Sequence, residues 1–145
     1  MTTTLGTARI SSTAAPTAFF ARWADTATWP EWNADTAWVR LDGPFAQGTT
    51  GMLKPKGGPK TKFVITALTE REFTDVSLLP GAKLTFHHEV DVDEAGATHV
   101  QVTVDLAGPM AWLWRRILGK DIAAGLPRDL AGLKAAAEAN VEVAA

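Results

Sequence analysis

Apolar and polar residues alternate with a period of two over most of the chain between Thr36 and Leu106. This period is typical of half-buried β-strands. The joints between the alternating stretches are rich in glycine, proline and aspartate and too short for crossover helices, so neighbouring strands should form antiparallel hairpins. The expected strands are Thr36–Leu41, Gly48–Lys54, Thr61–Thr69, Glu72–Leu79, Ala82–Val92 and Thr98–Leu106.

The clearest alternation lies in the last two of these strands. One face carries apolar side chains, and the other carries threonines, glutamine and charged residues. His88 falls on the apolar face, whereas its neighbour His87 falls on the polar one. The predicted inner positions are Leu84, Phe86, His88, Val90 and Val92 on the first strand, and Val100, Val102, Val104 and Leu106 on the second.

Segments with the spacing of helices precede and follow this block of strands. After an extended segment at Thr3–Ser12, Pro16 opens an amphipathic pattern, and a short helix or turn follows within Asp25–Asn33. A long helical segment runs from Met110 to about Asn140, with one apolar stripe before Gly125 and Pro127 and another after them. Because proline cannot donate its backbone hydrogen bond, we expect a bend or break at these two residues.

This order of elements predicts an α+β fold. A curved seven-stranded antiparallel sheet should wrap around the long C-terminal helix, with two short helices after the first strand, all in one domain spanning residues 1–145. A sheet curled around one helix leaves a space between them. Such spaces serve as ligand cavities.

Three stretches resemble a known superfamily: TWPEWNAD (28–35), GPFAQGTTGMLKPKGGPKTKFVITAL (43–68) and GPMAWLWRRILGKDIAAGLPRDLAGLKAAAE (108–138). They are similar to the START-related, birch-pollen-allergen-like proteins (SRPBCC), which include polyketide cyclases and lipid-transfer proteins. The resemblance implies a helix-grip fold over nearly the whole chain. It implies no particular activity, because the superfamily has no universal catalytic motif and one fold hosts many functions.

Composition narrows the function classes. The chain has no cysteine, which excludes disulfides and thiolate chemistry, and its net charge of -2 argues against a nucleic-acid partner. No apolar run reaches the length of a membrane span, and residues 1–13 lack the features of a secretory leader. We therefore expect a cytoplasmic monomer or homodimer without stable membrane insertion.

Six tryptophans and no tyrosine make tryptophan the main aromatic donor in any cavity. The candidate ligand-binding residues are Trp29, Trp32, Trp38, Phe63, Phe86, His88, Met110 and Trp114. Trp112 falls on the opposite side of the last helix and should meet solvent, the sheet edge or a partner. His88 is also the weak candidate for a catalytic acid or base, and we expect its pKa to lie below its ordinary value.

No metal or cofactor is expected. The adjacent residues His87 and His88 point to opposite faces of a strand and cannot chelate one ion. The favoured function is binding of a small hydrophobic molecule, such as a lipid, a polyketide or an aromatic metabolite. A cyclase or dehydrase acting on a polyketide-like precursor in the same cavity is the alternative, and an interaction module without ligand is a third.

Overall fold

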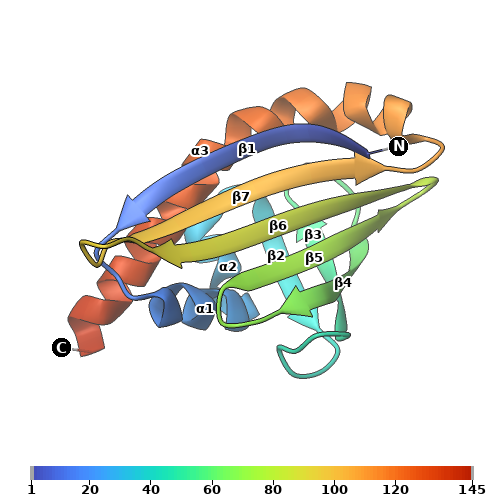
Figure 1. Ribbon diagram of the computed structural model, residues 1–145. Helices are drawn as coiled ribbons and strands as arrows, with labels where there is room; N and C mark the ends of the chain where they lie inside the picture. Colours follow the sequence, from blue (N-terminus) through green and yellow to red (C-terminus); the bar gives the residue numbers. More distant parts are fainter. Residues whose placement is uncertain (1, 145) are drawn as a thin grey trace.

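The computed structural model describes the backbone of residues 2–144 and the side chains of residues 2–139. Seven strands form one sheet in the order β1-β7-β6-β5-β4-β3-β2, and every neighbouring pair is antiparallel (Figure 1). The strands are β1 (Thr2–Ser12), β2 (Thr36–Leu41), β3 (Thr50–Pro55), β4 (Thr61–Leu68), β5 (Glu72–Leu79), β6 (Ala82–Val92) and β7 (Thr98–Ala107). The predicted strands are confirmed to within a few residues at each end.

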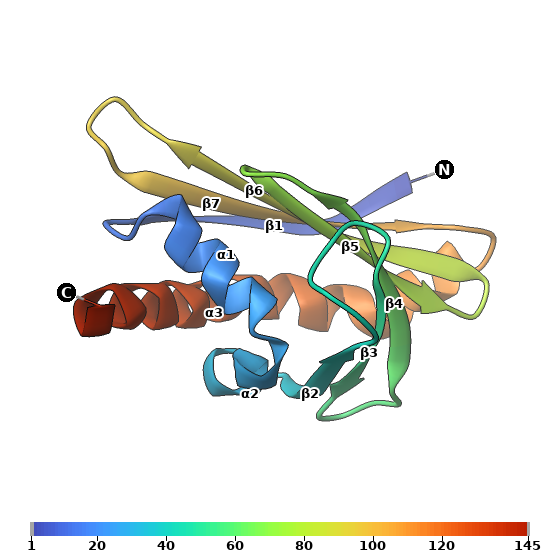
Figure 2. The same ribbon diagram turned by 90° about the horizontal axis from the view of Figure 1, so that it is seen from below.

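The helices lie together on one side of this sheet (Figure 2). They are α1 (Pro16–Ala24), the 3-10 turn η1 (Thr26–Thr28), α2 (Trp29–Trp32) and α3 (Ala111–Ala144). Pro16 occupies the first turn of α1, where its missing N–H leaves no hydrogen bond unmade. The predicted helix-grip architecture, with short helices after the first strand and a long helix at the end, is confirmed.

The core fills the space between the helices and the inner face of the sheet. On β6 and β7 the predicted alternation is confirmed, because the predicted inner valines and leucines are buried there, apart from Val92. From the other side, α1 contributes Phe19 and Trp23, both with less than 2 % of their surface exposed. Val92 departs from the pattern and is 42 % exposed, since it lies at the end of β6 beyond the cover of α1.

Helix α3 lies along β1 at the edge of the sheet. A Cβ atom added to Gly6 would lie 3.2 Å from Leu126 Cδ1, so glycine lets the strand and the helix approach closely here. The second half of α3 buries Leu126, Leu130, Leu133 and Ala137. In contrast, no residue from 111 to 124 is fully buried, and Trp112 is 60 % exposed, in line with its predicted position away from the core.

Of the bend or break expected at Gly125 and Pro127, the break is wrong, because α3 continues as one α-helix through both residues. Pro127 removes a single backbone hydrogen bond and points its ring to solvent. Leu126 and Leu130, on either side of Pro127, are both buried and hold this part of the helix against the core. Packing therefore outweighs the lost hydrogen bond.

No helix in the part of the chain that the structure describes combines the length and the hydropathy needed to cross a membrane.

Candidate functional site

An aromatic cluster occupies the inner face of the sheet where α1 crosses it. Phe73 on β5 stands at its centre, with the rings of Phe45 and Trp23 at 5.1 and 5.5 Å and that of Trp29 at 6.4 Å between centroids. Trp29 also donates a hydrogen bond of 3.0 Å from Nε1 to the carbonyl oxygen of Trp23. The cluster thus joins α1, α2 and the sheet.

His88 belongs to this cluster and lies on the inner face, as strand parity predicts. Its ring stacks on Phe73 with centroids 4.9 Å apart and planes tilted by 14°, and Trp23 lies against it at 5.0 Å. Nδ1 of His88 is 2.8 Å from the carbonyl oxygen of Phe73. A carbonyl oxygen can only accept, so Nδ1 carries the proton.

Burial lowers the pKa of His88 to about 4, and the hydrogen bond to Phe73 offsets only part of this effect. The predicted direction of the pKa shift is confirmed. At neutral pH the ring is uncharged. Its Nδ1 donates to the carbonyl oxygen of Phe73, and its Nε2 remains a hydrogen-bond acceptor.

Strand β5, which pairs with the strand of His88, carries polar residues at inward-facing positions. Phe73, Asp75 and Ser77 are buried, whereas Val76 and Leu78 on the opposite parity are more accessible, with Leu78 40 % exposed. Asp75 lies opposite Phe86 on β6 and Ile65 on β4. The inner face therefore carries a buried carboxyl group diagonally across the β5–β6 ladder from His88.

Burial raises the pKa of Asp75 to about 7, and a hydrogen bond from its own backbone offsets a small part of the shift. Asp75 is 5 % exposed, and its Oδ1 has no hydrogen-bond partner among the described side chains and backbone. A buried carboxyl without a partner costs free energy of folding, and perturbed groups of this kind gather at functional sites.

The predicted ligand-binding residues fall into three environments. Phe63, Phe86 and His88 lie on the inner face of the sheet, and Trp29 is buried in the aromatic cluster. Trp114, on the first half of α3, donates a hydrogen bond of 2.8 Å from Nε1 to the carbonyl oxygen of Pro80. The other three are more peripheral: Trp38 and Met110 are 38 % and 36 % exposed, and Trp32 is half-buried against α3.

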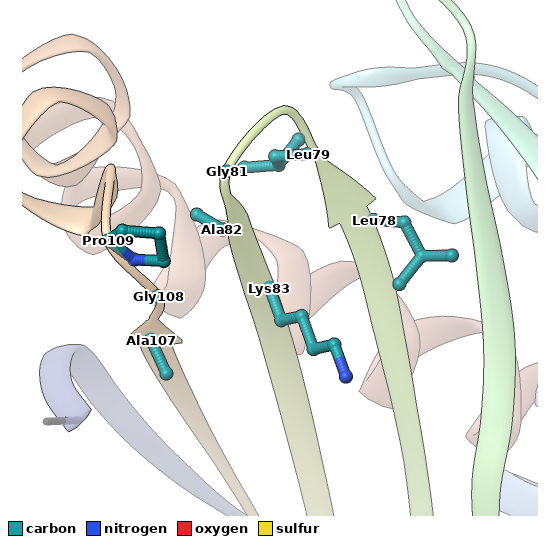
Figure 3. A pocket seen from close by; sticks show the side chains of 8 residues that line it. All are labelled: Leu78, Leu79, Gly81, Ala82, Lys83, Ala107, Gly108 and Pro109. Atoms are coloured by element: carbon teal, nitrogen blue, oxygen red, sulfur yellow. The ribbon is translucent and has the colours of Figure 1, made fainter.

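Two hollows open at the surface, and neither is lined by His88 or Asp75. The first, of about 430 Å³, lies at the β5–β6 turn and the start of α3 (Figure 3). Its walls are apolar side chains and backbone from two short segments, one at the β5–β6 turn and one at the end of β7. Lys83 is its single titratable residue.

The second hollow, of about 550 Å³, lies between α1, α2 and the end of α3. Small residues of α3 form its floor, and Arg22, Glu31 and Trp32 form its rim. Nε of Arg22 and Nε1 of Trp32 are buried donors with no acceptor within the described part of the chain. Of the predicted site residues, this hollow includes Trp32 alone.

The remaining histidines contact carboxylates on the outer side of the sheet. Nε2 of His87 lies 3.3 Å from Asp105, and Nε2 of His99 lies 2.7 Å from Asp93. No group of three or more histidine, aspartate and glutamate side chains in residues 2–139 is arranged to hold a metal ion.

Asp75 and Ser77 were not expected from the sequence. Apolar residues occupy both parities of β5, with Phe73 and Leu79 on one and Val76 and Leu78 on the other. The pattern therefore does not say which side faces inward. The only available signal was Phe73, whose size favours the buried parity that Asp75 shares.

No family model matches the chain, and no curated protein matches it. Solved structures do match. Norcoclaurine synthase from Thalictrum flavum superposes with a TM-score of 0.70 at 12% identity, covering 97% of this chain and 87% of that one. Ara h 8.0201 covers 99% of both chains with a TM-score of 0.64 at 14% identity.

A third match is the di-domain ARO/CYC StfQ from the steffimycin biosynthetic pathway, with a TM-score of 0.69 at 16% identity over 94% of this chain. This chain spans 51% of StfQ, about half of that two-domain protein. These three proteins share the helix-grip architecture. The resemblance predicted from the sequence is thereby confirmed for the fold: the chain has the helix-grip fold of the SRPBCC, Bet v 1-like proteins.

Proposed function

We propose that this protein binds a small hydrophobic molecule between the inner face of the sheet and the first half of α3. The observation that carries the proposal is the incomplete burial of residues 111–124. Apart from Trp112, which points away from the core, this half of α3 includes large apolar side chains, none of them fully buried: Leu113, Trp114, Ile117, Leu118 and Ile122. A helix with so many large apolar residues ordinarily buries a stripe of them.

The part of the sheet that faces this half of α3 also carries apolar side chains that are not fully buried. Phe86, at the middle of the inner face of β6, is only half-buried, as are Leu41 and Leu53 on the strands at the far edge. Apolar surface that remains exposed to water on two facing elements would gain about 25 cal/mol per Å² when an apolar ligand covers it. Phe63, Phe86, His88 and Trp114 are our candidate contacts.

The test is a fluorescence titration. We expect apolar aromatic and aliphatic compounds to change tryptophan emission in a saturable way at micromolar concentrations, because Trp114 lies on one candidate wall and Trp23 contacts His88. Substitution of Phe86 by aspartate, which places a charge in the proposed site, should abolish the saturable change. An equivalent substitution at the exposed Val92 is the matched control on the same strand.

The absence of saturation with every compound of a varied panel would overturn the proposal. Saturation that Phe86→Asp leaves unchanged would move binding away from this face, most simply to one of the two surface hollows.

A cyclase is the second candidate function, and Asp75 favours it. A carboxyl whose pKa lies at about 7 can take up and return protons at neutral pH, and this one lies beside apolar surface. The matched structures include a polyketide cyclase. Turnover of a poly-β-ketone that is lost in Asp75→Asn, with binding retained, would establish the activity.

A further inference from the structure

The polar groups on the inner face of β5 and β6 all belong to one small area. Asp75 and Ser77 face inward from β5, and His88 faces inward from β6, while the other inner positions of these two strands are apolar. Asp75 and His88 are diagonal neighbours, a relation that places side chains about 7–8 Å apart. A ligand with two adjacent donor groups can therefore reach both, and a ligand with one donor can reach either.

The free polar atoms of this pair are acceptors. Nδ1 of His88 donates to Phe73, which leaves Nε2 as an acceptor with no partner among the described residues. Oδ1 of Asp75 is likewise without a partner, and an ionised carboxylate can only accept. No lysine or arginine of the described chain forms an ion pair with Asp75.

The positions around Asp75 on the sheet are mainly apolar. Asp75 is flanked by Phe73 and Ser77 along β5, by Phe86 across β6 and by Ile65 across β4. Among the inner-face residues of β4 and β6 next to Asp75, His88 is the titratable one. The Ser77 hydroxyl, on the same face of β5, can also donate a hydrogen bond.

Taking the proposed function as its basis, we infer that the ligand carries a hydrogen-bond donor, an alcohol, phenol or amine, that Asp75 or Nε2 of His88 accepts. The same pair would disfavour a ligand carboxylate, whose oxygens would face two acceptors and a like charge. Buried polar groups left unpaired by the wrong ligand make this kind of discrimination strong. The directions of the two pKa shifts support this inference, because His88 is neutral at neutral pH and Asp75 is ionised above about pH 7.

The experiment compares three probes that share one apolar body: naphthalene, 2-naphthol and naphthalene-2-carboxylate. Binding to the intact protein is measured at pH 8 by equilibrium dialysis, where Asp75 is ionised. We expect 2-naphthol to bind about tenfold more tightly than naphthalene, the usual effect of one good hydrogen bond, and the carboxylate to bind most weakly.

Two variants locate the effect. In Asp75→Leu the advantage of 2-naphthol over naphthalene should fall by about tenfold, while naphthalene itself binds as before or more tightly. In Asp75→Asn the amide supplies an N–H donor, so the carboxylate should gain affinity. Asp91→Asn, which changes an exposed carboxylate on β6, is the matched control and should leave the order of the probes unchanged.

The outcomes separate the two proposals. If none of the probes binds, the proposed function fails. If all three bind but the carboxylate is preferred, or Asp75→Leu keeps the preference for 2-naphthol, binding stands and the role of Asp75 is wrong. Near-ultraviolet circular dichroism of each variant confirms that it is folded before its affinities are compared.

Discussion

Replacing Asp75 by asparagine is expected to make the unfolding free energy, taken relative to that of the wild-type protein at the same pH, rise steeply with pH between about 4 and 6.5. The reason is that two buried groups oppose each other. Burial raises the pKa of Asp75 from 3.8 to about 7 and lowers that of His88 from 6.5 to about 4. Their pKa shifts have opposite signs and nearly the same pH window.

The sign for each group follows from proton linkage. Asp75 binds more protons in the folded state, so its contribution to stability is complete below about pH 4 and is lost as the pH rises through about 7. His88 binds more protons in the unfolded state, so its contribution is complete above 6.5 and is lost as the pH falls through about 4. Between these limits the two slopes cancel.

Each substitution removes the slope of the group that it replaces. At 1.36 kcal/mol per pKa unit, Asp75→Asn should gain on the order of 3 kcal/mol relative to the wild type from pH 4 to 6.5, because the opposing titration of Asp75 is gone. His88→Leu should lose on the order of 3 kcal/mol relative to the wild type over the same range, because the titration of His88 is gone. Urea unfolding at half-unit pH steps measures both curves.

The difference between each variant and the wild type removes the contributions of all other groups, including Asp129, whose pKa burial raises to about 6. The double variant should run parallel to the wild type between pH 4 and 6.5, because the two removed slopes cancel, and it serves as the control. Curves for Asp75→Asn and wild type that stay parallel over pH 4–7 would show that the carboxyl is solvated, and the inference drawn for the ligand would fail with it.

The sequence contains enough information for the sheet because alternation is strong on β6 and β7. There every inner position except His88 and Thr98, the first residue of β7, is apolar, so the parity is unambiguous and places His88 correctly. Strand β5 lacks this contrast, and its inward face depends on pairing with β6 across the Pro80–Gly81 turn. The inward orientation of Asp75 therefore follows from the β5–β6 register and not from the sequence pattern.

The error at Pro127 has a different cause. Local chemistry favours a break there, but the leucines before and after it pack on one continuous surface. Tertiary packing outweighs local preference in such cases. The close contact between α2 and α3 could not be predicted from the sequence for a related reason. The sequence shows a glycine at position 132, but it does not show which part of the backbone packs against it.

Substitution of Gly132 by alanine is expected to destabilise the protein by about 1–3 kcal/mol, the usual cost of overpacking. A Cβ atom on Gly132 would overlap the carbonyl oxygen of Trp32, a backbone atom that cannot rotate away. The short helix α2 would have to move off α3. The second hollow would change shape with it, because Trp32 and Gly132 both line it.

Gly119 on the same helix provides the matched control. A Cβ atom there would meet nothing closer than 3.6 Å, so Gly119→Ala should stabilise the protein by up to about 1 kcal/mol through helix propensity alone. Urea unfolding of both variants measures the contrast, and tryptophan emission reports any displacement of Trp32. If Gly132→Ala were as stable as Gly119→Ala, then α2 would not be fixed against α3. The unpaired Nε1 of Trp32 would then be free to reach water.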